Sequence, residues 1–195
     1  MGLSVSYTCN FNSDARLGEM IEILTEICHT LDWPFQVVAD EFPADESKSA
    51  EGDIYGIIFT PINCETFSLC FTADRKITDP VFLAFPDLKE TNTFDGNIYI
   101  TVKTQFAGMK VHKIIIEIFK HLIKSGFLED FKMIDESRYW ETGDEELMRS
   151  QFKKYNDIMD NISLALRTIP PAKNESMEDF FERIIKRIEK RNNEK

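Results

Sequence analysis

The first part of the chain changes from a two-residue to a helical repeat of hydrophobic positions. Leu3, Val5 and Tyr7 alternate with serine and threonine, which is the pattern of a half-buried β-strand. Residues 17–31 then carry apolar side chains at intervals of three and four, and Ser13 is placed to cap a helix. The pattern predicts a strand followed by a helix that covers a sheet.

Several more strands are predicted in the middle of the chain. Short apolar stretches bounded by turn residues occur at residues 35–39, 53–60, 66–73 and 81–85. An acidic segment at residues 40–53 has no apolar period and is predicted to be a solvated loop. Because the connections are short, the strands favour an antiparallel meander. After the turn signal Asp95-Gly96, residues 98–105 alternate between an apolar and a polar face, which predicts another strand.

The rest of the chain has mainly helical periods. Residues 108–126 carry a broad apolar face and end in glycine, and residues 127–134 are predicted to be an edge strand or an irregular return. The next helix has an apolar stripe in alternating steps of four and three residues, at Met148, Phe152, Tyr155, Met159, Ile162, Leu166 and Ile169. Pro170-Pro171 ends this helix, because prolines donate no amide hydrogen bond and restrict the preceding residue.

A final helix is predicted from about Ser176, with a narrow apolar face on a charged segment. That face comprises Met177, Phe180, Phe181, Ile184, Ile185 and Ile188. Docking on the rest of the chain is favoured, because a stripe with two phenylalanines is costly to leave in water. A homodimer contact through this C-terminal helix is the alternative.

The order of the elements predicts an α+β fold. We expect a two-layer sandwich in which a mixed, mostly antiparallel sheet is covered by helices, with a C-terminal helical extension. Residues 1–169 are predicted to form a single domain, and residues 170–195 a Pro-Pro linker with the amphipathic helix.

Composition narrows the class of partner. The chain of 195 residues has 34 acidic and 23 basic side chains and a net charge of -11, so its mean field repels phosphate backbones and anionic lipids. Nucleic acid and membrane surfaces are therefore not expected as partners, and no apolar run reaches the roughly 20 residues that span a bilayer. A protein or a small ligand is expected instead, and the charge leaves room for a cationic one.

The cysteines and the standard motifs indicate neither a metal nor a cofactor. Cys9, Cys28, Cys64 and Cys70 are scattered, without the C-x-x-C pairs or companion histidines of a zinc site. The P-loop, Rossmann, nucleophile-elbow and zinc-protease fingerprints are also missing. Because the chain is long enough to fold without disulfides and begins without a signal segment, reduced cysteines and a cytoplasmic location are predicted.

Two histidines on the helix at residues 108–126 differ in their predicted surroundings. His112 and His121 are nine residues apart, so they lie on opposite sides of the helix and cannot share a metal. His112 falls within the apolar arc. It is interpreted as a buried core histidine, with a general acid or base as the alternative. His121 and His29 are predicted to be surface residues.

Two short segments are candidate ligand contacts. Lys103, Thr104 and Gln105 end a strand just before a helix, where α/β folds often place ligand contacts, although they also suit a solvent-facing strand end. Residues 135–146 carry six acids and one arginine. A capping box of Thr142 and Glu145 accounts for much of that charge.

The capping box leaves Tyr139, Trp140 and Glu141 unexplained. The aromatic pair is interpreted either as a hydrophobic staple or as the wall of a pocket, with Glu141 or Asp135 as its acid. Sequence spacing does not distinguish these two interpretations.

The same segments carry a resemblance. The stretch from Lys103 to Gly108, followed by Val111-His112 and then by residues 139–146 (YWETGDEE), resembles a family of uncharacterised bacterial proteins that share a KTQ-aromatic-A, VH and YWETGDE pattern. The similarity covers about residues 99–169. This chain departs from the family pattern at residues 136–138, where it has Glu-Ser-Arg and the family typically has glycine. The resemblance implies a bacterial cytoplasmic source and no particular activity.

Three functions are compatible with these features. The leading hypothesis is a non-enzymatic binding module in which the Lys103–Gln105 and Tyr139–Glu141 segments form one recognition surface. The second is a hydrolase or transferase with Asp135 or Glu141 as base, His112 as acid and Lys103 steadying an anion. It requires these groups to lie close together and His112 to be accessible. The third is an immunity-type protein that masks a basic toxin, which rests on size and charge.

Overall fold

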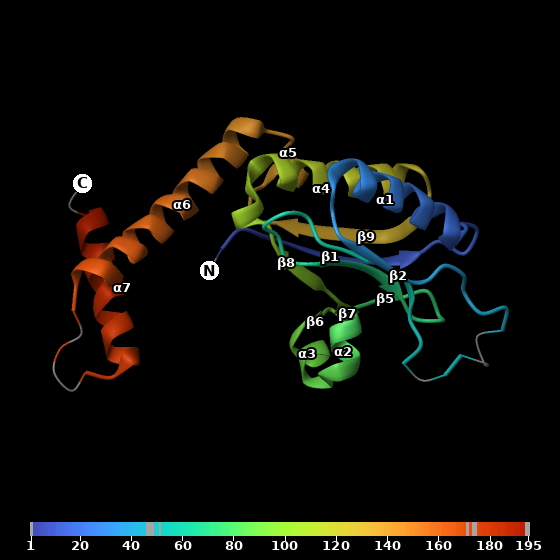
Figure 1. The fold of residues 1–195 in the computed structure, drawn as a ribbon, viewed down its shortest axis with the longest axis horizontal. Coiled ribbons are helices and arrows are strands. Elements are labelled where there is room, and N and C mark those ends of the chain that lie inside the picture. Colours follow the sequence, from blue (N-terminus) through green and yellow to red (C-terminus); the bar gives the residue numbers. More distant parts are fainter. Residues whose placement is uncertain (1, 46–48, 51, 171, 173–174, 194–195) are drawn as a thin grey trace.

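A computed structural model describes residues 2–45, 49–50, 52–170, 172 and 175–193, with side chains described as far as Arg187. Two helices lie along one face of a layer of strands, a small insert lies on the other face, and a helical extension leaves the body (Figure 1). The α+β fold predicted from the sequence is confirmed. In chain order the elements are β1 (Ser4–Phe11), α1 (Leu17–Leu31), β2 (Phe35–Ala39), β3 (Tyr55–Phe59), β4 (Phe67–Phe71), β5 (Ile77–Thr78), α2 (Pro80–Ala84), α3 (Pro86–Thr91), β6 (Thr93–Phe94), β7 (Asn97–Ile98), β8 (Ile100–Lys103), η2 (Gln105–Ala107), α4 (Gly108–Lys124), β9 (Leu128–Asp135), α5 (Tyr139–Thr142), α6 (Glu145–Thr168) and α7 (Met177–Asn193).

The strands form two main sheets that meet at β1. One has the order β8-β1-β9 and the other the order β2-β3-β4-β5, and all of their pairings are antiparallel. A bridge between Asn10 and Lys76 and a 2.9 Å hydrogen bond from Phe11 N to Arg75 O connect the end of β1 to the second sheet. The edge strand expected at residues 127–134 is β9, which confirms that interpretation.

Tyr7 of β1 joins the two sheets through its side chain. Strand β5 pairs only with Cys70 and Phe71 of β4, so the backbone of Ser68 lies beyond the end of β5. The Tyr7 hydroxyl donates to Ser68 O at 2.7 Å and accepts from Ser68 N at 3.2 Å. Burial raises the pKa of the Tyr7 phenol well above its ordinary value, which keeps the hydroxyl neutral. One side chain thus bonds both backbone polar groups of Ser68.

Aromatic side chains fill the core between the strands and the helices. The Tyr7 ring lies 4.7 Å from Phe119 of α4 and 6.1 Å from Phe67 of β4, measured between ring centroids. Both phenylalanines are wholly buried, as are Leu24 of α1 and Ile115 of α4. These contacts explain why the amphipathic faces of α1 and α4 lie on the sheet.

Residues 81–85 were predicted to be a strand, and this prediction is wrong: most of them belong to α2. Asp79 caps α2 by accepting a 2.8 Å hydrogen bond from the Val81 amide, and Pro80 occupies the first turn, where its fixed φ suits a helix. Short apolar runs do not distinguish strand from helix by period alone.

Two predicted helix caps also differ in the structure. Ser13 does not cap α1, whose N-cap residue is Arg16 with no side-chain hydrogen bond to the helix. At α6 the cap is Asp144, whose carboxylate accepts from the amides of Glu146 and Leu147 at 2.9 and 3.0 Å. Thr142 lies in the preceding turn and accepts from the Asp144 amide at 3.1 Å. The capping box predicted for Thr142 is therefore wrong.

The C-terminal helices extend away from the sheet. Met148 and Phe152 of α6 are buried against the body, whereas the second half of α6 projects and α7 crosses it (Figure 1). A small separate cluster forms there from Ala165, Phe180 and Ile184. The final helix thus docks on α6 rather than on the sheet. Pro171 and the side chain of Ile188 lie outside the described residues.

Within the described part of the chain, none of the helices is both long and apolar enough to cross a bilayer.

Candidate functional site

A buried polar cluster around His112 joins three elements of the body. His112 Nδ1 lies 2.7 Å from Thr104 Oγ1, just after β8, and its Nε2 lies 2.9 Å from Ser137 Oγ, just after β9. The Asp135 carboxylate completes the cluster. Its Oδ1 lies 3.2 Å from His112 Nε2, and its Oδ2 accepts a 2.8 Å hydrogen bond from Ser137. The cluster ties α4 to the ends of two strands that are separated by β1.

The turn after β9 is organised by the Asp135 carboxylate. It accepts hydrogen bonds from the amides of Ser137 at 2.8 Å and Trp140 at 3.0 Å. Arg138 between them adopts a left-handed conformation, with φ of 66°. The Tyr139 amide donates to Ser137 Oγ at 3.2 Å. Because the Asp135 carboxylate accepts hydrogen bonds from two amides of this turn, it fixes the direction in which α5 starts.

Asp135 is held in its ionised form in the folded protein. Burial by itself raises the pKa of its carboxyl. The hydrogen bond and charge of His112, with smaller contributions from the Trp140 amide and Ser137, outweigh burial and hold the pKa below its ordinary value. A carboxyl whose pKa is lower in the folded than in the unfolded chain stabilises the fold above the unfolded pKa.

We expect Asp135→Asn to remove a pH-dependent part of the stability. The wild type should have the higher free energy of unfolding at neutral pH, and this difference should shrink as the pH falls below about 4, the unfolded pKa of aspartate. Urea unfolding of both proteins across this range measures the difference. Asp160→Asn, at an exposed position of α6, is the control and should give a small difference at every pH. If the difference in free energy of unfolding between the wild type and Asp135→Asn stays constant with pH, the ionisation of Asp135 does not contribute to stability.

The cluster contains serine, histidine and aspartate but not in the arrangement of a catalytic triad. In a triad the carboxylate bonds Nδ1 and the serine bonds Nε2. Here Thr104 occupies Nδ1, and Ser137 and Asp135 share Nε2. All four side chains are buried, and His112 is wholly so. His112 is thus a core histidine, as its position in the apolar arc predicted. The accessibility that the hydrolase hypothesis requires is contradicted, so we do not propose that function.

The first predicted contact segment, Lys103 to Gln105, is mostly turned inward. Lys103 is exposed, and its amide donates to the Glu65 carboxylate at 2.8 Å. Thr104 and Gln105 are buried, and their amides both donate to Leu3 O, at 2.9 and 3.1 Å. Among the described side chains, Gln105 Nε2 is the single buried polar atom without a hydrogen-bond partner.

The second predicted segment, Tyr139 to Glu141, is largely part of the packing. Tyr139 is buried beneath the ammonium groups of Lys113 and Lys120, which lie 5.7 and 5.2 Å from its ring centroid. Trp140 is half-buried and packs on Phe131, with 5.3 Å between ring centroids. Glu141 alone faces solvent. Thr104 and the Tyr139 amide are thus linked indirectly, through His112 and Ser137, and of the six predicted contact side chains only those of Lys103 and Glu141 are exposed.

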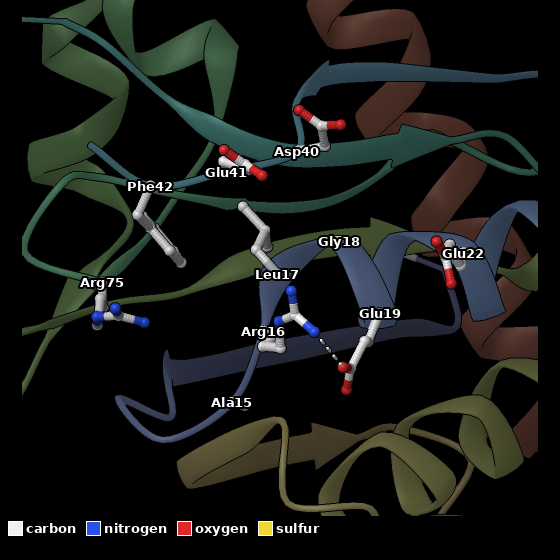
Figure 2. Close-up of a pocket in the computed structure, with 10 residues that line it drawn as sticks. All are labelled: Ala15, Arg16, Leu17, Gly18, Glu19, Glu22, Asp40, Glu41, Phe42 and Arg75. Carbon is white, nitrogen blue, oxygen red and sulfur yellow. Dashed lines mark hydrogen bonds and ion pairs between the residues drawn. The ribbon is translucent and has the colours of Figure 1, made fainter. Parts of the chain in front are cut away.

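A hollow of about 550 Å³ lies at the start of α1 (Figure 2). Its charged lining is mixed: Arg16 pairs with Glu19 at 3.4 Å, and Arg75 stacks on Phe42 at 4.5 Å from the ring centroid. Asp40 and Glu41 stand on the facing loop. Four acids and two arginines line the hollow, so it has no single-sign field for a ligand. Across the described residues, no group of three or more His, Cys, Asp or Glu side chains is placed to hold a metal ion.

The insert at residues 79–99, formed by α2, α3, β6 and β7, exposes several large apolar side chains whose exposure the sequence pattern did not reveal. It lies on the side of the sheet away from α1 and α4 (Figure 1). Only Phe82 among its largest apolar side chains is buried. The exposed ones, between 43% and 65% accessible, are Val81, Leu83, Phe85, Leu88 and Phe94. We call these five residues the insert patch. Val81 and Leu83 are two residues apart on α2 and therefore point to different sides of that helix, so the insert exposes apolar side chains in more than one direction.

The insert is also acidic. It contains Asp79, Asp87, Glu90 and Asp95 against the single base Lys89. The Phe94 ring packs edge-on against Tyr99, with 6.5 Å between ring centroids, so Phe94 is positioned although exposed. Exposed aromatic side chains are enriched at protein-binding surfaces, so Phe94 is a candidate anchor.

Comparison of the chain with protein-family models, curated proteins and solved structures found no match in any of the three.

Proposed function

We propose that this protein is a non-enzymatic protein-binding module and that the insert patch is its binding surface. The observation that carries the proposal is the exposure of five large apolar side chains within the insert at residues 79–99. Burying them against a partner removes their apolar area from water, at roughly 25 cal/mol per Å².

The charge of the chain supports a basic partner. The insert carries four acids and one base, and the whole chain has a net charge of -11. Opposite charges around an apolar centre speed association and exclude acidic competitors, whereas the apolar centre supplies most of the affinity. The partner that fits is a protein with an apolar contact area and a basic rim.

One class of basic partner is a toxin that is masked by an acidic immunity-type protein. The size and charge of this chain suit that role, and the insert patch adds an apolar contact. A toxin gene adjacent to the gene of this protein would favour this class. If no toxin gene is adjacent, another basic partner is favoured, and the insert patch remains the proposed binding surface.

The binding surface is tested by site-specific photo-crosslinking in the native cell. A photoreactive amino acid at Phe94 should give a crosslink to a basic protein. The same probe at Ile62, which is 56% exposed in the turn after β3, should not. With the purified partner, Phe94→Asp should weaken binding at least about tenfold, as expected for an aromatic anchor. Raising the salt concentration should also weaken it.

Two outcomes would contradict the proposal. One is equal crosslinking from Phe94 and Ile62. The other is unchanged affinity of the partner for both Phe94→Asp and Phe85→Asp when circular dichroism shows that the variants are folded. A self-crosslink from Phe94 would replace the basic partner by a second copy.

A further inference from the structure

The two residues that connect β6 to β7 form a tight turn in the insert. Phe94 pairs with Asn97, so Asp95 and Gly96 make up the whole loop. Their φ values are 49° and 74°, and positive values at both positions of a two-residue hairpin loop are typical of a type I′ turn. Both residues are exposed, and a Cβ added at Gly96 would meet no atom within 4 Å beyond its chain neighbours. The peptide bond between them is therefore accessible to water.

Neither the carboxylate of Asp95 nor the amide of Gly96 is engaged in the fold. Within the described part of the chain, no hydrogen bond or ion pair involves either group. The Asn97 side chain donates to Asp95 at 3.2 Å, but the acceptor is the backbone carbonyl, which leaves the carboxylate unbonded. A carboxyl and the amide that directly follows it are thus both free to react with each other.

Two other aspartates with a positive φ do not offer this combination. Asp32, with φ of 53°, precedes a tryptophan whose amide is held by a 2.8 Å hydrogen bond to the end of α1. Asp130, with φ of 51°, precedes a phenylalanine, and its carboxylate accepts a 3.0 Å hydrogen bond from Asn10. Asp95 is followed by a glycine, which has no side chain to obstruct an approach to its nitrogen.

An aspartate and the amide after it can rearrange through a cyclic imide. The Gly96 nitrogen attacks Cγ of the protonated Asp95 carboxyl, an N–C bond forms, the C–O bond breaks, and a water molecule leaves with the amide proton. Water then opens the ring at either carbonyl. Opening at Cγ restores aspartate. Opening at the original backbone carbonyl breaks the old peptide bond and leaves an isoaspartate, in which the main chain runs through Cβ and Cγ and the α-carboxylate is free.

An isoaspartate at residue 95 would change the length of the turn, because the main chain gains a carbon atom there. The register of a short hairpin is set by its turn. Strands β6 and β7 have two residues each, so little else holds the pairing of Phe94 with Asn97. The Phe94 ring, which packs edge-on against Tyr99, is attached directly beside the altered turn.

We propose that Asp95-Gly96 is a site of spontaneous conversion of aspartate to isoaspartate, and that the conversion displaces Phe94 from its place in the hairpin. Water is the only co-reactant. The inference stands independently of the proposed function, because it concerns the covalent structure of the turn.

Peptide mapping of the aged full-length protein tests the conversion. The protein is incubated at physiological temperature in mildly acidic buffer and then digested. The peptide with residue 95 should give a second chromatographic peak of unchanged mass, which a protease specific for aspartate no longer cleaves at this position. Peptides with Asp32 and Asp130 should remain unchanged. Equal isoaspartate at all three positions, or none at residue 95, would overturn the inference.

Two substitutions that keep the turn provide matched controls. Asn-Gly and Gly-Gly both suit a type I′ turn, so Asp95→Asn and Asp95→Gly should preserve the hairpin. Asp95→Asn forms the same imide with loss of ammonia and should give isoaspartate at residue 95. Asp95→Gly has no carboxyl to react and should give none. If an isoaspartate-specific carboxyl methyltransferase labels aged Asp95→Gly as strongly as the aged wild type, the site lies elsewhere and the inference fails.

Hydrogen exchange tests the displacement of Phe94. The Tyr99 amide donates to Asn92 O at 2.8 Å across the base of the hairpin. In the converted protein this amide should exchange at least about tenfold faster than in fresh protein, because local opening becomes easier when the turn no longer fits. Aged Asp95→Gly should exchange like its fresh form. Unchanged exchange at Tyr99 in converted protein would contradict the displacement.

Discussion

We expect His112→Phe to lower the free energy of unfolding by about 3–5 kcal/mol, the range measured when one member of a buried polar pair is removed. Phenylalanine fills the site and keeps the edge-on contact with Phe152, which lies 5.4 Å from the His112 ring centroid. It cannot bond Thr104, Ser137 or Asp135. The buried Asp135 carboxylate then loses its contact with the His112 ring while it remains out of water, which is the main source of the loss.

His121→Phe is the matched control for this prediction. It makes the same substitution on the same helix, α4, at an exposed position. Its effect should stay within about 0.5 kcal/mol, as for most surface substitutions. Urea unfolding measures both variants. If His112→Phe lowers the stability no more than His121→Phe does, the buried cluster does not hold α4 to the strand ends.

Tyr7→Phe should lower the free energy of unfolding by about 2–4 kcal/mol, although it removes a single oxygen atom. The ring keeps its contacts with Phe67 and Phe119. The amide and carbonyl of Ser68, however, lose the partner that satisfies both of them. Each buried backbone group that is left without a hydrogen bond costs about 1–3 kcal/mol.

Tyr155→Phe tests whether a lost hydroxyl alone has this effect. Tyr155 is half-exposed on α6, and no hydrogen bond of its hydroxyl occurs among the described residues. Thermal and urea unfolding of both variants should show a large loss for Tyr7→Phe and little change for Tyr155→Phe. Equal losses would mean that the bond between β1 and Ser68 does not stabilise the junction of the two sheets.

In the candidate site, the burial of His112 was predictable from the sequence, but its hydrogen-bond partners were not. The position of His112 on the apolar arc of α4 was enough to place its ring in the core, because burial follows from helical period. The side chains that bond it were not predictable. Ser137 follows β9 and Thr104 follows β8, and these strands flank β1 rather than each other. Spacing along the chain contains no information about which strand ends meet the same helix.

In the insert, the secondary structure had a local sequence signal, but the exposure of its side chains did not. Asp79-Pro80 carried a local start signal for α2, and recognising it would have corrected the strand predicted at residues 81–85. The exposure of Phe85 and Phe94 had no such signal. A large apolar residue is exposed or buried according to what packs on it, and that depends on elements far away in the chain.

The sequence by itself determined the type and order of the strongly periodic elements β1, α1, α4 and α6. It also determined the acidic character of the surface and the burial of His112. These features depend on side-chain period and on charge, which are local properties. Only the tertiary structure decided that Thr104 and Ser137 bond the same buried histidine, that Tyr7 links two sheets, and that large apolar side chains of the insert stay uncovered. These features depend on contacts between residues that are distant in the chain.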